Sequence, residues 1–535
     1  MSRDASKDQG SVDGQLQASD GNSKLDSHVL RSTSTSKMLS AMTVPVDAAF
    51  LAWFRFAFGI VMACYAVNNL MSGSVRMMYG DPTFHFKYFG FHWVPVLPQS
   101  GMFAFFICLG ILALMIALGL CYRIASLAFA VLFTWLFLMD RTYYQNHYYL
   151  VTLLSWMMVI LPAGKIYAFD VLGRSDKSIA TVPAWMLWVV RFHIGLPYFM
   201  GGIAKLDGDW LLGQPMRMTL ASRTWVPGIG QFMTEDWMVS LFSWGGMLFD
   251  LFVVPGLLWR RTRVFAFAAA LAFHLTNAFM FTIGIFPWLM IAATCVFFPP
   301  GWPRRVLTGR RLKLSSQVGD EVTLSAGLGS NQKSRQQVST IAILLCLYVT
   351  FHLLWPLRYL ASDQSPNWTE RGHFFAWHML LRGKKSGLRY FAVDRDTGDF
   401  EVVNLRRYLA IHQMPKLGRD PENIRQLANL IHADFLKDEQ RDVEIRVFSL
   451  VSMNGRKPQL MIDPNVDLGR EPSTLSVPGW IVPLKEPLRR DHWSFRISEW
   501  EQRLGIQVND VMGFPSIATS RSKTRVDAKG SATDQ

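Results

Sequence analysis

Residues 101–121, GMFAFFICLGILALMIALGLC, contain no charged side chain. A helix of this length, at 1.5 Å per residue, crosses the hydrocarbon core of a bilayer, which is about 30 Å thick. The chain holds eight further apolar segments of comparable length, at 47–70, 123–139, 143–162, 184–204, 237–258, 264–282, 284–299 and 337–357. The sequence therefore predicts a mostly α-helical, polytopic transmembrane bundle of about nine spans.

A small α+β soluble domain is predicted to follow the last span. Residues 388–394, 399–405 and 443–453 have the composition of strands, with a turn at 396–398 between the first two, and 420–438 has the periodicity of an amphipathic helix. The predicted division of the chain is a disordered N-terminal tail (1–45), the transmembrane bundle (46–308), a cytoplasmic linker (309–336), the last transmembrane helix (337–362), the α+β domain (363–515) and a disordered tail (516–535).

The basic residues are distributed unevenly between the two sides of the predicted bundle. When the loops are counted alternately, 19 Lys and Arg residues fall on one side and 6 on the other. Positive residues are retained on the cytoplasmic side, so we expect a cytoplasmic N-terminus and an α+β domain on the outer face. Treating 264–299 as a single span would remove this asymmetry, which favours nine spans over eight.

The net charge of +14 does not indicate a nucleic-acid partner, because no soluble segment interleaves basic and aromatic residues. Cationic loops that face anionic lipid account for it. The five cysteines lie in or next to apolar segments and form no CxxC pattern, so we expect neither a disulfide framework nor a metal site. An outer domain without cysteine is typical of a bacterial protein, which places the chain in a bacterial inner membrane.

Several polar side chains lie inside the predicted spans, where each ionisable group costs about 2.5 to 3.5 kcal/mol on insertion scales. Any one of them could pair with a neighbouring helix as a structural contact. A set spread over several helices instead favours a polar interior. The set consists of Arg55, Arg191, His193, Asp250, His274 and Asn277.

Lys205 follows the apolar segment 184–204, in the stretch FMGGIAKLDGDWLLG (199–213). Its amine could extend to the membrane interface, as long cationic side chains often do. It could also form an ion pair with Asp207 or Asp209, or act as a general base after burial has lowered its pKa. The two nearby carboxylates would favour the charged amine, so the last role requires them to point away.

A second polar group precedes the fourth predicted span, in DRTYYQNHYYL (140–150). Asn146 and His147 lie among four tyrosines, an arrangement that also suits an aromatic belt at the membrane interface. The chain has no HExxH, P-loop or GxSxG motif. The residues by themselves indicate a membrane protein with a polar interior, and a non-catalytic lipid-binding or transport protein is one candidate.

Seven segments, taken in order, resemble the vitamin K-dependent gamma-carboxylase family, in the form of bacterial-type homologues with the horizontally transferred transmembrane domain. They are LAWFRFAFGIVM, GLCYRIASLAFA, DRTYYQNHYYL, GGIAKLDGDW, FHLTNAFMFTIGIFPWLMIA, NWTERGHFFAWHMLLR and MIDPNVDL. The resemblance covers about 47–490. It implies an integral-membrane peptidyl-glutamate carboxylase of the carbon-carbon lyase type. Its cofactor would be reduced vitamin K of the menaquinol or phylloquinol type, its co-substrates O2 and CO2, its substrate a glutamate-containing peptide or protein, and no metal would be required.

The resemblance also implies roles for particular residues. Lys205 corresponds to the base that deprotonates reduced vitamin K; the oxygenated quinol then removes a γ-proton from glutamate, CO2 adds to the carbanion, and the quinone leaves as its epoxide. Asn146 and His147 match a catalytic Asn-His pair. Residues at positions of the substrate and quinol pocket are Arg191, His274, Asn277, Trp377 and Met379, and two further candidates are Arg55 and Lys165, the latter where animal enzymes carry a functional histidine. A quinol epoxidase that does not carboxylate is the alternative activity.

Overall fold

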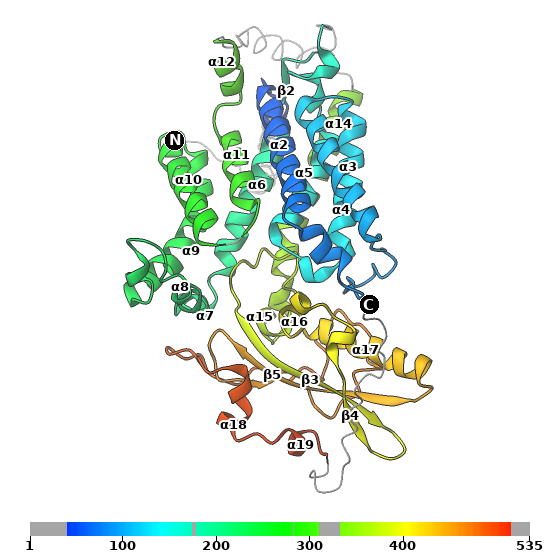
Figure 1. Ribbon diagram of the computed structural model, residues 1–535. Helices are drawn as coiled ribbons and strands as arrows, with labels where there is room; N and C mark the ends of the chain where they lie inside the picture. The colour runs from blue at the N-terminus through cyan, green and yellow to red at the C-terminus, as the bar shows by residue number, and fades with distance from the viewer. Residues whose placement is uncertain (1–39, 174–177, 282, 310–331, 515–535) are drawn as a thin grey trace, which may run out of the picture.

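The computed structural model describes residues 40–173, 178–281, 283–309 and 332–514. A bundle of long helices forms one end of the molecule, and a smaller domain containing a sheet is attached to the other (Figure 1). The predicted tail 516–535 lies outside the described residues, as do most of the tail 1–45 and most of the linker 309–336. The described end of that linker is already helical, because α14 begins at Gln332.

Each of the nine predicted apolar segments contains a helix. Among the described residues, seven helices are long and apolar enough to cross a membrane. Two helices are shorter: α5 has 15 residues, and α11 has 9 before a 3-10 turn extends it to Phe297. The nine helices are α2 (Ala49–Met71), α3 (Gln99–Leu118), α4 (Tyr122–Met139), α5 (Asn146–Ile160), α6 (Ala184–Ala204), α9 (Asp236–Leu258), α10 (Arg263–Met280), α11 (Phe286–Thr294) and α14 (Gln332–Leu354). The predicted fold class is confirmed, and the number of crossings stays a prediction.

Small residues set how closely the helices approach one another. At Gly202 in α6, a Cβ atom would lie 2.8 Å from the side chain of Leu251 and 3.0 Å from its backbone nitrogen, so α6 and α9 are in backbone contact there. Gly59 of α2 meets α3 in the same way, since its Cβ would lie 2.5 Å from the carbonyl oxygen of Ala113. A short antiparallel ribbon of β1 (Pro45–Asp47) and β2 (Thr181–Pro183) joins the starts of α2 and α6.

The second domain contains a four-stranded antiparallel sheet in the order β4-β3-β5-β6. Its strands are β3 (Lys384–Asp394), β4 (Phe400–Val402), β5 (Val443–Met453) and β6 (Gln459–Leu460). Side chains of β3 alternate between its faces, as in any strand. Tyr390 and Ala392 pack with α17 (Pro421–Asp438), whereas Phe391 packs against Trp500. The predicted hairpin turn is present, with Gly398 at φ +73°.

Shorter elements complete both parts of the molecule. Two of them, α7 (Gly208–Leu211) and α8 (Met216–Ala221), connect α6 to α9 beside the second domain (Figure 1). The others are α12 (Trp302–Thr308), α15 (Pro366–Thr369), α16 (Met414–Leu417), α18 (Trp500–Leu504) and α19 (Val508–Val511).

Polar contacts fix the α+β domain against the end of the bundle. Arg141, which lies between α4 and α5, forms an ion pair with Asp420 at 2.7 Å, and both side chains are buried. The amide of Gln426 exchanges two hydrogen bonds of 2.9 Å with the backbone of Lys87. Because buried polar groups are satisfied across this boundary, the two parts are held in one relative position.

Candidate active site

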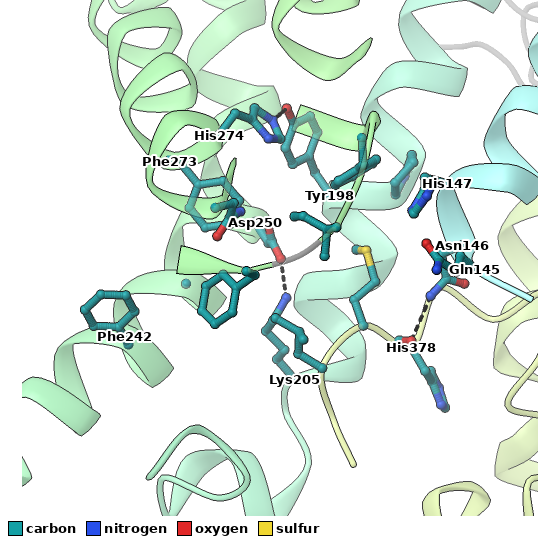
Figure 2. Close-up of a pocket in the computed structure, with 18 of the residues that line it drawn as sticks. Gln145, Asn146, His147, Tyr198, Lys205, Phe242, Asp250, Phe273, His274 and His378 are labelled. Carbon is teal, nitrogen blue, oxygen red and sulfur yellow. Dashed lines mark hydrogen bonds and ion pairs between the residues drawn. The ribbon is translucent and has the colours of Figure 1, made fainter. Parts of the chain in front are cut away.

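A cavity of about 270 Å³ lies in the half of the bundle next to the α+β domain, and Figure 2 shows most of its wall. Helices α5 to α11 all contribute to it, together with the loop that leads into β3. Six residues predicted for the site line this cavity: Asn146, His147, Lys205, His274, Asn277 and Met379. Most of the remaining wall is apolar and aromatic, which is typical of small-molecule sites.

Lys205 caps the C-terminus of α6 and is buried. Its side chain is 7% exposed, so the amine does not extend to the interface. The ammonium forms an ion pair with the carboxylate of Asp250 from α9, which is 3% exposed. The ring of Trp210 lies 5.3 Å from the Lys205 nitrogen, within the range of a cation–π contact. Lys205 is therefore a buried, paired amine in the cavity wall (Figure 2).

The two acids that follow Lys205 in the sequence point elsewhere. The Asp207 carboxylate accepts a hydrogen bond of 3.0 Å from the backbone nitrogen of Asp209 and caps α7. Burial, with Asp209 beside it, raises the pKa of the Asp207 carboxyl. Asp209 is paired with Arg456 of the α+β domain, with two nitrogen–oxygen distances of 2.5 and 2.7 Å, and it also accepts a bond from Asn454. Neither acid is the partner of Lys205.

The shape of α6 and α9 explains why Asp250 reaches Lys205. Gly202 allows α9 to approach α6, and a Cβ at Gly201 would lie 3.5 Å from the Asp250 carboxylate. On α9, Phe242, Gly246 and Asp250 recur every four residues, so they lie on one face of that helix and line the cavity together. The glycine pair thus places the ion pair at the centre of the wall.

Asn146 uses both ends of its side chain to hold neighbouring chain segments. Its amide nitrogen donates to the carbonyl of His378 at 2.8 Å, and its oxygen accepts from the hydroxyl of Tyr144 at 2.9 Å. The Nε2 atom of His147, by contrast, is buried and has no hydrogen-bond partner among the described residues, and the ring centroid of His147 is 5.7 Å from that of Phe286. A buried polar atom with no partner calls for an explanation, and a bound polar group is one.

His274 and Tyr198 form another polar contact in the wall. Nε2 of His274 and the hydroxyl of Tyr198 are 2.5 Å apart. In the part of the chain that the structure describes, the other ring nitrogen, Nδ1, is buried and has no partner. Phe273 and Phe286 stand beside this pair. The cavity thus combines flat apolar surfaces with two unpaired histidine nitrogens, one from His147 and one from His274.

The loop before β3 closes the cavity on the side of the α+β domain. Four of its non-glycine residues, Glu370, Phe375, Trp377 and Leu380, have φ near +60°, a left-handed conformation that costs about 1 kcal/mol or more for each such residue. Strain of this kind persists where surrounding contacts hold it, often beside functional sites. Burial lowers the pKa of His378 in this loop to about 4.

Trp377 does not line the cavity. Its ring packs 5.0 Å from that of Tyr149, between the loop and α5, where it is 1% exposed. Met379, two residues further on, is in the cavity wall. Trp377 therefore supports the loop that carries Met379.

Arg191, Arg55 and Lys165 lie away from the cavity. Arg191 donates to the carbonyls of Val296 at 3.0 Å and Phe298 at 3.2 Å, where α11 ends. Arg55 likewise donates to carbonyls that follow α5, with its shortest bond, 2.7 Å, to Tyr167. Lys165 is exposed beyond the same end of α5. The two arginines thus satisfy backbone carbonyl groups in the segments that follow α5 and α11.

Several wall residues were not predicted, and part of the signal for them was in the sequence. Tyr198 precedes Lys205 by seven residues, or about two helical turns, and so shares its face. Asp250 was recognised as an intramembrane acid, but its partner lies 45 residues away and spacing cannot reveal such a contact. Among the described residues, no group of three or more His, Cys, Asp or Glu side chains is arranged as a metal site.

Two family models match this chain. The HTTM domain matches residues 43–302, and the vitamin K-dependent gamma-carboxylase, lumenal domain, matches residues 337–487. No solved structure matches it. The apolar helices and the HTTM match define an integral membrane protein. The two matches together span most of the sequence, and the chain belongs to the vitamin K-dependent gamma-carboxylase family.

Proposed function

We propose that the protein couples oxygenation of reduced vitamin K to its epoxide with carboxylation of glutamate to γ-carboxyglutamate. The four-electron oxidation of the hydroquinone to the epoxide balances the reduction of O2, of which one oxygen enters the epoxide and the other leaves as water. Glutamate loses a γ-proton and gains CO2. The observation that carries the proposal is the buried Lys205–Asp250 pair in the wall of an apolar cavity within the bundle.

The residues around the cavity suit a hydroquinone. Phe273 and Phe286 offer flat apolar surfaces to an aromatic ring system. The unpaired nitrogens of His147 and His274 offer hydrogen-bonding positions for its oxygens. When bound and oxygenated, reduced vitamin K supplies the strong base that removes the γ-proton of glutamate. The mostly apolar wall limits the water near such a base.

The Lys205–Asp250 pair can accept one proton as a unit. Before the transfer the pair consists of an ammonium group and a carboxylate, with no net charge. Afterwards it consists of an ammonium group and a neutral carboxylic acid. The unit then carries one positive charge, which faces the anion formed next to it. In an apolar cavity this attraction is much stronger than in water. Trp210 contributes a second surface that favours the ammonium form.

The proposal assigns the glutamate-containing peptide to the side of the α+β domain. Gln145 and Leu380 are exposed there and also line the cavity. Lipid and quinone would contact the bundle itself. We place the protein in a bacterial inner membrane with its N-terminus in the cytoplasm and the α+β domain outside, following the distribution of basic residues.

The reaction is tested with purified protein in detergent and vitamin K hydroquinone. Epoxide formation is measured with and without labelled CO2 and a glutamyl peptide. Epoxide together with labelled peptide supports the proposal. Epoxide alone would assign the alternative, a quinol epoxidase, and the absence of both products would leave a non-catalytic lipid-binding or transport protein.

The role of Lys205 is tested by chemical rescue. Lys205→Ala should lower epoxide formation about 10²- to 10⁴-fold, the usual effect of removing a positioned general base. Small exogenous amines should restore part of this activity, increasingly as the pH approaches the pKa of the amine. The same amines should not restore Arg191→Ala, because Arg191 binds backbone carbonyls away from the cavity. A folded Lys205→Ala protein with normal turnover would show that Lys205 is not the base.

No metal ion takes part in the proposed reaction. Metal analysis of active protein after treatment with a chelator checks this point. Zinc or iron present in stoichiometric amount, and lost together with activity, would overturn it and would assign His147 a ligand role.

A further inference from the structure

The residues that line the cavity differ in how far they are exposed. Lys205, Asp250, His147 and His274 are buried. Phe242 and Asn277 are partly exposed, and Gln145 is exposed. In Figure 2, Phe242 and His147 are at opposite ends, with Lys205 and Asp250 between them. Exposed wall residues toward both ends indicate an opening of the cavity at each of them.

The first opening lies between α9 and α10. Phe242 and Gly246 of α9 and Asn277 of α10 line the cavity and are all partly exposed. The neighbouring outward side chains of α9 include Leu241 and Trp244, which are 57% and 47% exposed. Large exposed apolar side chains on a membrane-spanning helix face lipid. This opening therefore faces the bilayer rather than water.

The second opening lies at the boundary with the α+β domain. It is formed by Gln145, at the start of α5, and Leu380, in the loop before β3, which is 45% exposed. The polar contacts that hold this loop, such as the bond from Asn146 to His378, are next to it. A polar substrate can reach this opening from the aqueous side without crossing lipid.

We propose that the opening between α9 and α10 is a lateral passage that holds the polyisoprenoid tail of the quinol in the lipid. This inference rests on the proposed function. The quinol ring lies in the cavity, the tail passes Phe242, Gly246 and Asn277, and the glutamyl peptide uses the opening at Gln145 and Leu380. A lipid-borne and a water-borne substrate thus meet at the buried ion pair without sharing a path.

Gly246 is the position at which this passage can be narrowed. A Cβ atom there would meet only Trp210, at 4.0 Å, so a side chain fits and would project into the space beside the cavity. The adjacent Gly245 provides a matched control, because a Cβ there would meet only Leu241 at 3.9 Å and the residue does not line the cavity. Both substitutions add the same side chain to the same turn of α9.

The first experiment compares two menaquinols, with one and with four isoprene units. Gly246→Leu should raise the KM for the longer quinol about tenfold, which corresponds to about 1.4 kcal/mol of lost binding. The KM for the shorter quinol and for the glutamyl peptide should stay within about twofold. Gly245→Leu should leave all three KM values unchanged. Thermal unfolding of each variant checks folding, and Gly246→Ala should give a smaller effect in the same direction.

An equal effect of Gly246→Leu on both quinols would overturn the inference, since it would place residue 246 beside the ring and not the tail. No effect on either quinol from a folded protein would also overturn it.

The second experiment needs no turnover. A menaquinone analogue with a photoreactive diazirine at the end of its tail is irradiated with the purified protein, and the labelled peptides are mapped. Label on 241–249 and 271–281 supports the passage, whereas label confined to α5 or to the loop before β3 contradicts it. Should the protein form no epoxide, labelling of α9 and α10 would still support the passage while the proposed reaction failed.

Discussion

The partner of Lys205 determines what a substitution at this site would show. Removing one member of a buried ion pair leaves an unpaired charge and costs about 3 to 5 kcal/mol, whereas replacing both by apolar residues is often neutral. Loss of activity in a single variant could therefore reflect loss of stability. The pair offers a way to separate the two effects, because both of its side chains are almost completely buried.

We expect Lys205→Met and Asp250→Leu each to lower the free energy of unfolding by about 3 kcal/mol, and the double variant to regain most of that loss. The double variant should still form no epoxide, because the proton-accepting unit is absent. Denaturant unfolding and epoxide assays on the three proteins provide the measurement. An active double variant would show that the pair is only structural.

The residue types of the site could be predicted from the sequence, but their pairing could not. Lys205, His147 and His274 were identified because polar groups are costly in apolar segments and because their motifs resemble a family. The Asp207 carboxylate lies two residues from Lys205 yet caps α7, whereas Asp250 forms the ion pair from another helix. Which of several acids meets a lysine depends on how helices pack, and a local pattern carries no such information.

At the scale of elements, the contact between α6 and α9 is the one on which the site depends. Apolar length predicted both helices, since a bilayer imposes a minimum span. Gly201 and Gly202 belong to the motif GGIAKLDGDW. The sequence does not show that they face α9, which the structure places against them. The start of the short helix α5 also differs from the prediction. Its apolar segment was predicted to begin at residue 143, whereas the helix begins at Asn146, a residue of the cavity wall.

Substitution at Gly202 should separate α6 from α9. The Cβ of Gly202→Ala would fall 2.8 Å from Leu251, so α9 must shift, and overpacking of this kind costs about 1 to 3 kcal/mol. Because Asp250 would move with α9, epoxide formation should fall more than stability alone explains. Gly208→Ala is the control, as no atom lies within 4 Å of a Cβ there. Equal unfolding temperatures and rates for the two variants would contradict this account.

At the scale of the whole molecule, stability should depend on pH through a histidine pair at the boundary of the two parts. His373 and His378 are buried with their Nδ1 atoms 3.3 Å apart. Burial lowers the pKa of His378 to about 4 and that of His373 well below its usual value. Two neutral rings can share one hydrogen bond, whereas two charged rings would repel each other.

The direction in which stability changes with pH follows from proton binding by the folded and unfolded states. Between about pH 6.5 and pH 4 the unfolded chain binds protons that the folded protein excludes. Stability is therefore complete above pH 6.5 and falls as the pH is lowered, by up to about 1.4 kcal/mol per pH unit for each histidine. Thermal unfolding across this range measures the slope. His378→Asn should flatten it and exposed His92→Asn should not; an unchanged slope in His378→Asn would refute the assignment.

The ion pair between Asp209 and Arg456 has a consequence for how precisely the membrane site is aligned. Asp209 lies four residues after Lys205, and Arg456 follows β5 in the α+β domain, with 2.5 Å between their closest atoms. This contact ties the short segment between Lys205 and α7 to the α+β domain. The position of Lys205 therefore depends on contacts of the α+β domain as well as on the packing of the helices.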